Sequence, residues 1–119
     1  MTKYKAVSTV IDGVRFASKA EAERYCELRL LLRAGEIENL EMQPKYPISI
    51  NGVKICTYIA DFRYVSRKQG PQGQEGHVVV EDVKGTKTPL YRLKKKLVEA
   101  LYPGVKIEEI QIARRKFVK

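Results

Sequence analysis

A run of three valines followed by charged residues constrains the fold more than any other stretch of the chain. Val78–Val80 is β-branched and leads into the segment Glu81–Gly85, which reads EDVKG; this pattern predicts a buried strand with polar residues at its end. Because side chains alternate along a strand, Asp82 and Lys84 are expected on one face, and Glu81 on the other as a surface or helix-facing charge. A carboxylate and an ammonium so placed suit metal-dependent cleavage of phosphodiesters, although such a pair also occurs as charges at a frayed strand end.

Length and composition indicate an ordinary folded protein. A chain of 119 residues with 44% hydrophobic content is expected to form a single domain over residues 1–119. No apolar run approaches the ~20 residues that a membrane span requires, and the first residues lack the apolar stretch of a signal peptide. We therefore expect no membrane partner and a cytoplasmic location. Cys26, Cys56 and His77 are isolated from one another in the sequence, which argues against a zinc site.

The positive charge is concentrated in the last third of the chain. Residues 1–84 carry 13 Lys and Arg against 11 Asp and Glu, whereas residues 85–119 carry 10 against 3, a net charge of +7 out of a total of +9. A basic segment that follows a cluster of acids fits a polyanionic partner and a metal site together, because carboxylates alone would repel phosphate. The alternative is a basic protein without such a partner, and charge alone does not reject it.

The first third of the chain predicts a small hairpin and a helix. Asp12-Gly13 favours a tight turn within residues 7–16. Ser18 and Glu21 have the spacing of a capping box at the start of a helix over residues 19–33, which ends before Gly35. The expected apolar stripe of this helix contains Ala22, Cys26 and Leu30, widened by Tyr25, Leu28, Leu31 and Leu32.

The middle of the chain predicts extended structure. Pro44 and Pro47 favour an edge strand or a connection over residues 37–50, and Asn51-Gly52 favours a hairpin turn. Residues 53–65 are predicted to form one long strand, apolar on both faces and therefore covered on both sides. Asp61 lies in this pattern, and a buried carboxylate requires a lysine, another cation or a metal nearby.

The last part of the chain predicts a loop, a strand, a helix and a final strand. Residues 66–76 are polar and rich in Gly and Gln, which favours a loop before the strand over residues 77–84. Thr88 and Pro89 predict the start of a helix over residues 89–101, and residues 105–112 predict the last strand. The expected apolar face of this helix consists of Leu90, Leu93, Leu97, Ala100 and Leu101.

Taken together, these elements predict an α/β (α+β) protein in which a mixed central β-sheet is flanked by helices. Glu21 on the first helix, Asp61 on one strand and the sequence Asp82-Val83-Lys84 on the next resemble the PD-(D/E)XK nuclease superfamily. The resemblance implies a restriction-endonuclease-like αβββαβ core, here preceded by an N-terminal hairpin. Ala60 stands where the superfamily label has proline, a residue that carries no chemistry.

A closer resemblance is to small phage- and prophage-encoded proteins that are similar to endonuclease I-type Holliday junction resolvases. It covers nearly the whole chain and is carried by FASKAE with Tyr25, LEMQPKY, YIADF, VEDVKG, YRLKKK and Tyr102-Pro103. The resemblance implies a divalent-metal-dependent DNA endonuclease that acts on branched or junction DNA. It also implies a homodimer, because two symmetric cuts need two sites, and a location in the host cytoplasm if the chain is phage-encoded.

The resemblance also implies a role for each matched residue. Asp61 and Asp82 would bind Mg²⁺, or Mn²⁺ as a substitute, with the Val83 carbonyl as a further oxygen ligand. Glu21 would face them from the helix and belong to the metal site by holding a metal-bound water or a second ion. Lys84 would orient the attacking water and offset the charge that develops on the phosphate.

Simpler interpretations exist for each of these residues. Glu21 could serve only as the capping partner of Ser18, and Asp61 could form a structural ion pair with Arg63 or Lys84. The whole chain could instead be a non-catalytic DNA-binding module of phage replication or packaging that keeps the nuclease fold. A basic protein-interaction domain is a third reading, but it leaves the buried acids unexplained.

The expected DNA contacts are basic and polar side chains that would bind phosphates without reading bases, so binding should weaken steeply with salt. An exposed, solvated helix face is the alternative for any one of them. These residues are Lys87, Arg92, Lys94, Lys95, Lys68, Gln43 and Lys45.

Overall fold

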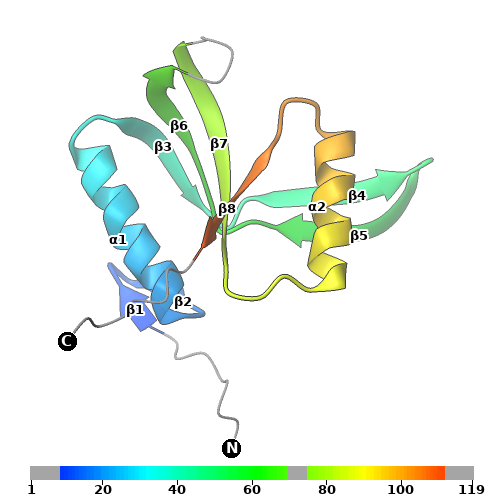
Figure 1. Ribbon diagram of the computed structural model, residues 1–119, viewed down its shortest axis with the longest axis horizontal. Coiled ribbons are helices and arrows are strands. Elements are labelled where there is room, and N and C mark those ends of the chain that lie inside the picture. The colour runs from blue at the N-terminus through cyan, green and yellow to red at the C-terminus, as the bar shows by residue number, and fades with distance from the viewer. Residues whose placement is uncertain (1–8, 70–74, 112–119) are drawn as a thin grey trace, which may run out of the picture. The chain divides into compact units, whose positions relative to one another are not determined.

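The computed structural model describes residues 9–69 and 75–111. The described residues form two helices and several short strands (Figure 1). In chain order the elements are β1 (Thr9–Ile11), β2 (Val14–Phe16), α1 (Lys19–Arg33), β3 (Ile37–Met42), β4 (Lys45–Ile50), β5 (Val53–Ile59), β6 (Phe62–Gln69), β7 (Glu75–Lys84), α2 (Pro89–Leu101) and β8 (Ile107–Gln111). Neither helix in this part of the chain is both long and apolar enough to span a bilayer.

The chain divides into two compact units. The first unit contains Met1–Leu40 and Val65–His77, and the second contains Glu41–Tyr64 and Val78–Lys119. β3, β6 and β7 each begin in one unit and end in the other. The single domain over residues 1–119 stays a prediction.

Four strands form a sheet in the order β3-β6-β7-β8. β7 and β8 are parallel, with a register that runs from Val80 opposite Ile107 to Lys84 opposite Gln111. α2 lies between them in the chain and supplies the crossover connection that a parallel pair requires. The predicted mixed sheet and the α+β class are confirmed. The described part of the chain has five strands, β3 to β7, between the two helices, instead of the three of the expected αβββαβ core.

The first unit confirms the predicted hairpin turn and the bounds of the first helix. Asp12 and Gly13 have φ angles of 54° and 77°, as a tight turn between β1 and β2 requires. Ser18 caps α1 by accepting a hydrogen bond at Oγ from the Glu21 N–H at 3.1 Å. Gly35, with a φ angle of 79°, follows the end of the helix.

The predicted apolar stripe of α1 is wrong in part. Ala22, Tyr25 and Leu28 are buried, whereas Cys26 is exposed and Leu30 is 64% exposed. The Tyr25 ring packs 4.9 Å from that of Phe16 on β2, measured between centroids. Tyr25 Oη also donates a hydrogen bond to Asp12 at 3.1 Å. The hairpin therefore packs against the face of α1 that contains Tyr25, and Leu30 points away from this face.

The predicted long strand over residues 53–65 is interrupted at Ala60 and Asp61. The Ala60 N–H donates to the Pro44 carbonyl at 3.1 Å, and the Asp61 N–H donates to the Glu81 carbonyl at 3.1 Å. These two bonds lead the chain out of one sheet and into another: β5 pairs with β4, whereas β6 pairs with β3 and β7. The polar loop predicted over residues 66–76 is also shorter, because β6 continues to Gln69 and β7 begins at Glu75.

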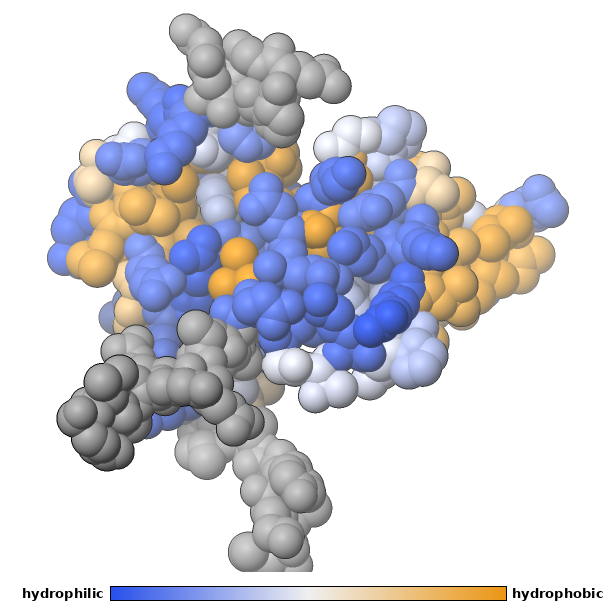
Figure 2. Space-filling model, in the orientation of Figure 1, coloured by the Kyte–Doolittle hydropathy of each residue, from blue (hydrophilic) through white to orange (hydrophobic). Residues whose placement is uncertain are grey.

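β4 and β5 form a separate two-stranded ribbon (Figure 1). The predicted turn is confirmed, since Asn51 and Gly52 have φ angles of 53° and 79°. Pro47 lies in β4, which pairs only with β5 among the described strands, so the predicted edge position is also confirmed. The prediction that residues 53–65 are covered on both sides is wrong for the β5 part: Val53, Ile55 and Ile59 are exposed. Figure 2 shows apolar side chains gathered over the ribbon.

The hydrophobic core of the second unit lies between the inner face of this ribbon, α2 and the ends of β7 and β8. Its buried members are Tyr46, Ile48, Tyr58, Ala60, Val80, Tyr91, Val98 and Ile107. α2 begins as predicted, because Thr88 Oγ1 accepts a hydrogen bond from the Tyr91 N–H at 3.1 Å and Pro89 follows the cap.

The predicted leucine face of α2 is wrong in part. Tyr91 and Val98 are its buried residues, and Leu97 packs partly against the core. Leu90, Leu93 and Leu101 are exposed. The Tyr91 ring packs 6.4 Å from that of Tyr58, measured between centroids. The buried face of the helix therefore contains Tyr91 and Val98, and of the predicted leucines Leu97 packs against the core.

Candidate active site at the end of β7

The last residues of β7 place an acid and a lysine together, as predicted. Asp82 is only 3% exposed, and Lys84 Nζ lies 3.4 Å from Asp82 Oδ1. Glu81 points to the opposite face and is 1% exposed. The surface position considered for Glu81 is therefore wrong; its carboxyl tolerates burial because Tyr64 Oη donates a hydrogen bond to it.

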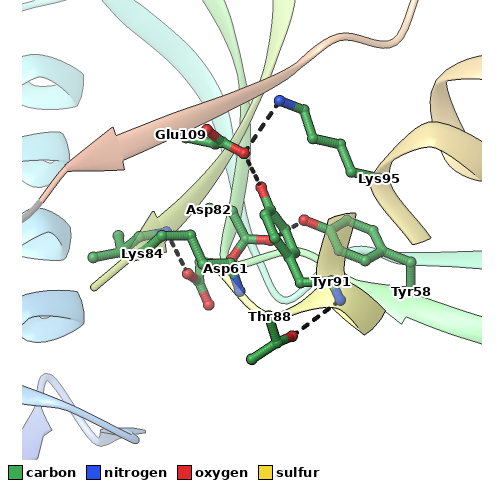
Figure 3. Close-up of polar contacts among 9 residues, drawn as sticks. Tyr58, Asp61, Asp82, Lys84, Thr88, Tyr91, Lys95 and Glu109 are labelled. Carbon is green, nitrogen blue, oxygen red and sulfur yellow. Dashed lines mark hydrogen bonds and ion pairs between the residues drawn. The ribbon is translucent and has the colours of Figure 1, made fainter. Parts of the chain in front are cut away.

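The bend between β5 and β6 brings Asp61 to the same place. The Val83 N–H donates to Asp61 Oδ2 at 2.7 Å, and the Asp61 N–H donates to the Glu81 carbonyl at 3.1 Å. Asp61 is thus held against β7 by backbone hydrogen bonds on both sides of Asp82. Figure 3 shows Asp61, Asp82 and Lys84 in one cluster.

The proposed ion pair between Asp61 and Arg63 is wrong. The Arg63 guanidinium is bound instead to Glu41, with Nη2 2.5 Å from Oε1, and it donates to Tyr46 Oη at 3.0 Å. Lys84 remains the cation that acts on Asp61, since its charge lowers the Asp61 pKa.

Burial dominates the electrostatics of the two aspartates. It raises the pKa of Asp82 to about 6, although the charge and hydrogen bond of Lys84 act in the opposite direction. Burial also raises the pKa of Asp61, against the Val83 N–H and the charge of Lys84. The two carboxyls have lost solvation that a single lysine does not replace, and a further cation would compensate them.

Two tyrosines complete the surroundings of the cluster. Tyr58 Oη donates a hydrogen bond to Asp82 Oδ2. The Tyr91 ring lies under the lysine, with Lys84 Nζ 4.1 Å from the ring centroid, a cation–π distance. Both tyrosines lie in sequence motifs noted above, but neither was predicted to contact the site. The alternation that places Tyr58 on the inner face of its strand was the available signal.

Glu109 on β8 was also missed. It is the register partner of Asp82 across the parallel pair. Tyr91 Oη donates to Glu109 Oε2 at 2.8 Å, and the ammonium groups of Lys87 and Lys95 lie 3.0 Å and 3.2 Å from the Glu109 carboxylate. The hydrogen bond from Lys87 is the largest of the influences that lower the Glu109 pKa to about 2. No local pattern identifies this residue, because its position depends on the register between β7 and β8.

The predicted DNA contacts fall into three groups. Lys87 and Lys95 are bound to Glu109 and are not isolated charges. Lys94 lines a pocket together with Lys84. The other four are exposed: Arg92, Gln43 and Lys45 in the second unit, and Lys68 in the first.

Glu21 lies in the first turn of α1, in the first unit. Its backbone N–H makes the predicted capping bond with Ser18. The role of its carboxyl in holding a metal-bound water or a second ion stays a prediction.

The donor set of the cluster suits a hard cation. Within residues 9–69 and 75–111, no group of three or more His, Cys, Asp and Glu side chains has the arrangement of a metal site. Mg²⁺, however, is commonly bound through one or two carboxylates together with water. Asp61 and Asp82 provide two carboxyl groups beside one strand end, and the charge of Lys84 only partly opposes the effect of burial on their pKa values. The residues present therefore fit a divalent ion of this type.

Comparisons with curated proteins and with solved structures found no match. One protein family, with the description "Protein of unknown function (DUF1064)", matches residues 1–117. This match extends over nearly the whole chain, so the protein is a member of that family.

Proposed function

We propose that the end of β7 is the catalytic centre of a divalent-metal-dependent endonuclease of the PD-(D/E)XK type, which hydrolyses phosphodiester bonds in DNA. The observation that carries the proposal is the meeting of Asp61, Asp82 and Lys84. Asp61 reaches the strand end only because the chain bends there, and Val83, between the other two residues, donates its N–H to the Asp61 carboxylate.

Each residue has a definite task in this proposal. Asp61 and Asp82 hold Mg²⁺ or Mn²⁺, which when bound acts as a Lewis acid toward the phosphate and makes a water more acidic. Lys84 orients the attacking water and offsets the negative charge that develops on the phosphate oxygens. Tyr58 fixes the orientation of Asp82 through its hydroxyl, and Tyr91 supports the Lys84 ammonium from below.

The arrangement favours an enzyme over a module that only binds DNA. A buried and a half-buried carboxylate beside a lysine destabilise the fold by their desolvation and would repel a phosphate without a metal. A binding surface has no use for them. A preference for branched DNA, a homodimer and a phage origin rest on the family resemblance and are part of the proposal. The cytoplasmic location expected from the sequence is part of it as well.

The test is cleavage of labelled four-way junction, duplex and single-stranded DNA in the presence of Mg²⁺, Mn²⁺ or EDTA. We expect cleavage with either metal and none with EDTA. Asp82→Asn and Lys84→Ala should lose cleavage but keep DNA binding. The matched control is Glu108→Gln, which also removes one carboxylate, but from an exposed position on β8 outside the cluster. Normal cleavage by both Asp82→Asn and Lys84→Ala would contradict the assignment.

A further inference from the structure

A pocket opens directly beside Lys84. Its volume is about 300 Å³, and its walls come from β5, from the end of β7 and from the first turns of α2. The Tyr58 and Tyr91 side chains, which contact Asp82 and Lys84, form part of these walls. Any ligand in this pocket would therefore lie next to the proposed catalytic centre. The volume is at the lower end of the range of about 300–1,000 Å³ that is usual for small-ligand sites.

One part of the pocket wall is apolar. Ile59 on β5 and Leu90 on α2 both line the pocket, and they are 50% and 60% exposed. The free energy falls when a flat or apolar ligand covers apolar side chains that are otherwise exposed to water. These two residues therefore favour a ligand that has a ring or another apolar surface.

The remaining wall is polar and cationic. Lys84 and Lys94 provide two ammonium groups, Thr57 and Thr88 provide hydroxyls, and no acid lines the pocket. Within the part of the chain that the structure describes, no ion pair involves Lys94, whereas its neighbour Lys95 is bound to Glu109. Of the two pocket lysines, Lys84 is paired with Asp82, so Lys94 is the one available to an anion. A phosphate is the anion that the neighbouring centre would bring.

We propose that this pocket is a subsite for one nucleotide of the cleaved strand, next to the scissile phosphate. Lys94 binds the adjacent phosphate, and Ile59 and Leu90 contact the nucleoside. Because apolar contact does not depend on hydrogen bonds to base edges, the subsite accepts any base. The statement that the nucleotide belongs to the cleaved strand rests on the proposed function. The binding of a nucleotide can be measured without cleavage.

The experiment is a titration of the protein with thymidine 5′-monophosphate in EDTA, followed by methyl and amide NMR spectra. We expect shifts at Thr57, Ile59, Leu90 and Lys94. Leu90→Ala and Lys94→Ala should each weaken binding by about tenfold. The controls are Leu93→Ala and Lys96→Ala, which remove the same kinds of side chain from exposed positions of the same helix outside the pocket, and they should bind as the wild type does.

Two further arms separate the possible outcomes. Inorganic phosphate should bind more weakly than the nucleotide, and equal affinity would show an anion site without a nucleoside subsite and would overturn the proposal. Unchanged binding in both pocket variants, with their spectra showing an intact fold, would overturn it as well. Since the titration contains no metal and no DNA cleavage, its failure leaves the proposed endonuclease untouched, and a failure of cleavage leaves the nucleotide site untouched.

Discussion

Asp82 and Glu109 face each other across the parallel strands β7 and β8, and their pKa values move in opposite directions. Burial raises the pKa of Asp82 to about 6, whereas hydrogen bonds from Lys87 and Tyr91 hold that of Glu109 at about 2. Two neighbouring acids thus have different tasks: one is a desolvated carboxyl in need of a cation, and the other is a satisfied counter-ion for lysines.

The raised pKa of Asp82 predicts how stability depends on pH. The folded state binds a proton more tightly than the unfolded state, whose Asp pKa is 3.8. The burial of Asp82 therefore destabilises the fold increasingly as the pH rises from about 4 to about 6. The side chain of Asp82→Asn carries no charge at any pH. Its free energy of unfolding relative to the wild type should therefore increase by roughly 2–3 kcal/mol over this range. Urea unfolding at pH 4 and pH 7 measures the difference, and a pH-independent difference would contradict it.

The same pKa predicts that metal binding depends on pH. Protonated Asp82 is a poor ligand, so the affinity for Mn²⁺ should fall as the pH drops below about 6. Calorimetric titration with Mn²⁺ between pH 5 and pH 8 checks this. Asp61→Asn should weaken binding throughout the range, and Glu108→Gln should leave the whole curve unchanged.

Tyr58→Phe should reduce cleavage, because Asp82 loses the hydroxyl that orients its carboxylate. The fold should also lose about 1–3 kcal/mol of stability, the usual consequence of a buried acceptor without its partner. Tyr64→Phe is the matched control, since it removes an equivalent bond to Glu81 on the other face of β7. It should destabilise the protein by a similar amount and leave cleavage per folded molecule unaltered. Equal losses of cleavage in both variants would contradict the role of Tyr58.

Glu109→Gln should strengthen DNA binding and make it more dependent on salt. The substitution releases Lys87 and Lys95 from their counter-ion, so more cations can displace the ions bound to phosphate. The measurement is duplex affinity from 50 to 300 mM KCl, concentrations chosen to span the range in which phosphate contacts are screened. Glu108→Gln changes the net charge by the same amount at an exposed position, and an identical response in the two variants would contradict the pairing.

The corrected face of α1 is tested by two leucines of the same helix. Leu28 is fully buried and Leu30 is 64% exposed. Leu28→Ala should destabilise the protein by about 2–5 kcal/mol. Leu30→Ala should change stability by no more than about 0.5 kcal/mol. Chemical denaturation of both variants measures the difference. The predicted stripe contained both leucines, and comparable losses in the two variants would contradict the structure.

Local chemistry was sufficient to predict the turns and helix ends. Asp12-Gly13 and Asn51-Gly52 were identifiable because few residue pairs tolerate two consecutive positive φ angles. Ser18 and Thr88 were identifiable because a hydroxyl before a helix satisfies an N–H of the first turn. The neighbouring positions of Asp82 and Lys84 followed from strand alternation alone.

The features that the sequence did not predict depend on contacts between residues that are distant in the chain. The bend at Asp61 depends on the carbonyls of Pro44 and Glu81. The leucines of α2 have the spacing of an apolar face, but the helix packs Tyr91 against the Tyr58 ring. Glu109 required the register of β8 against β7, which no pattern in either strand contains.

The bend at Asp61 also determines how the chain tolerates changes in length. Phe62 and Tyr64 are buried at alternate positions immediately after it, and Tyr58 and Ala60 are buried at alternate positions before it. An inserted or deleted residue between Ala60 and Phe62 would exchange the inward and outward positions of everything that follows in β6. Surface loops commonly tolerate insertions and deletions, but the segment from Ala60 to Phe62 must keep its length for the Asp61 carboxylate to remain beside the end of β7.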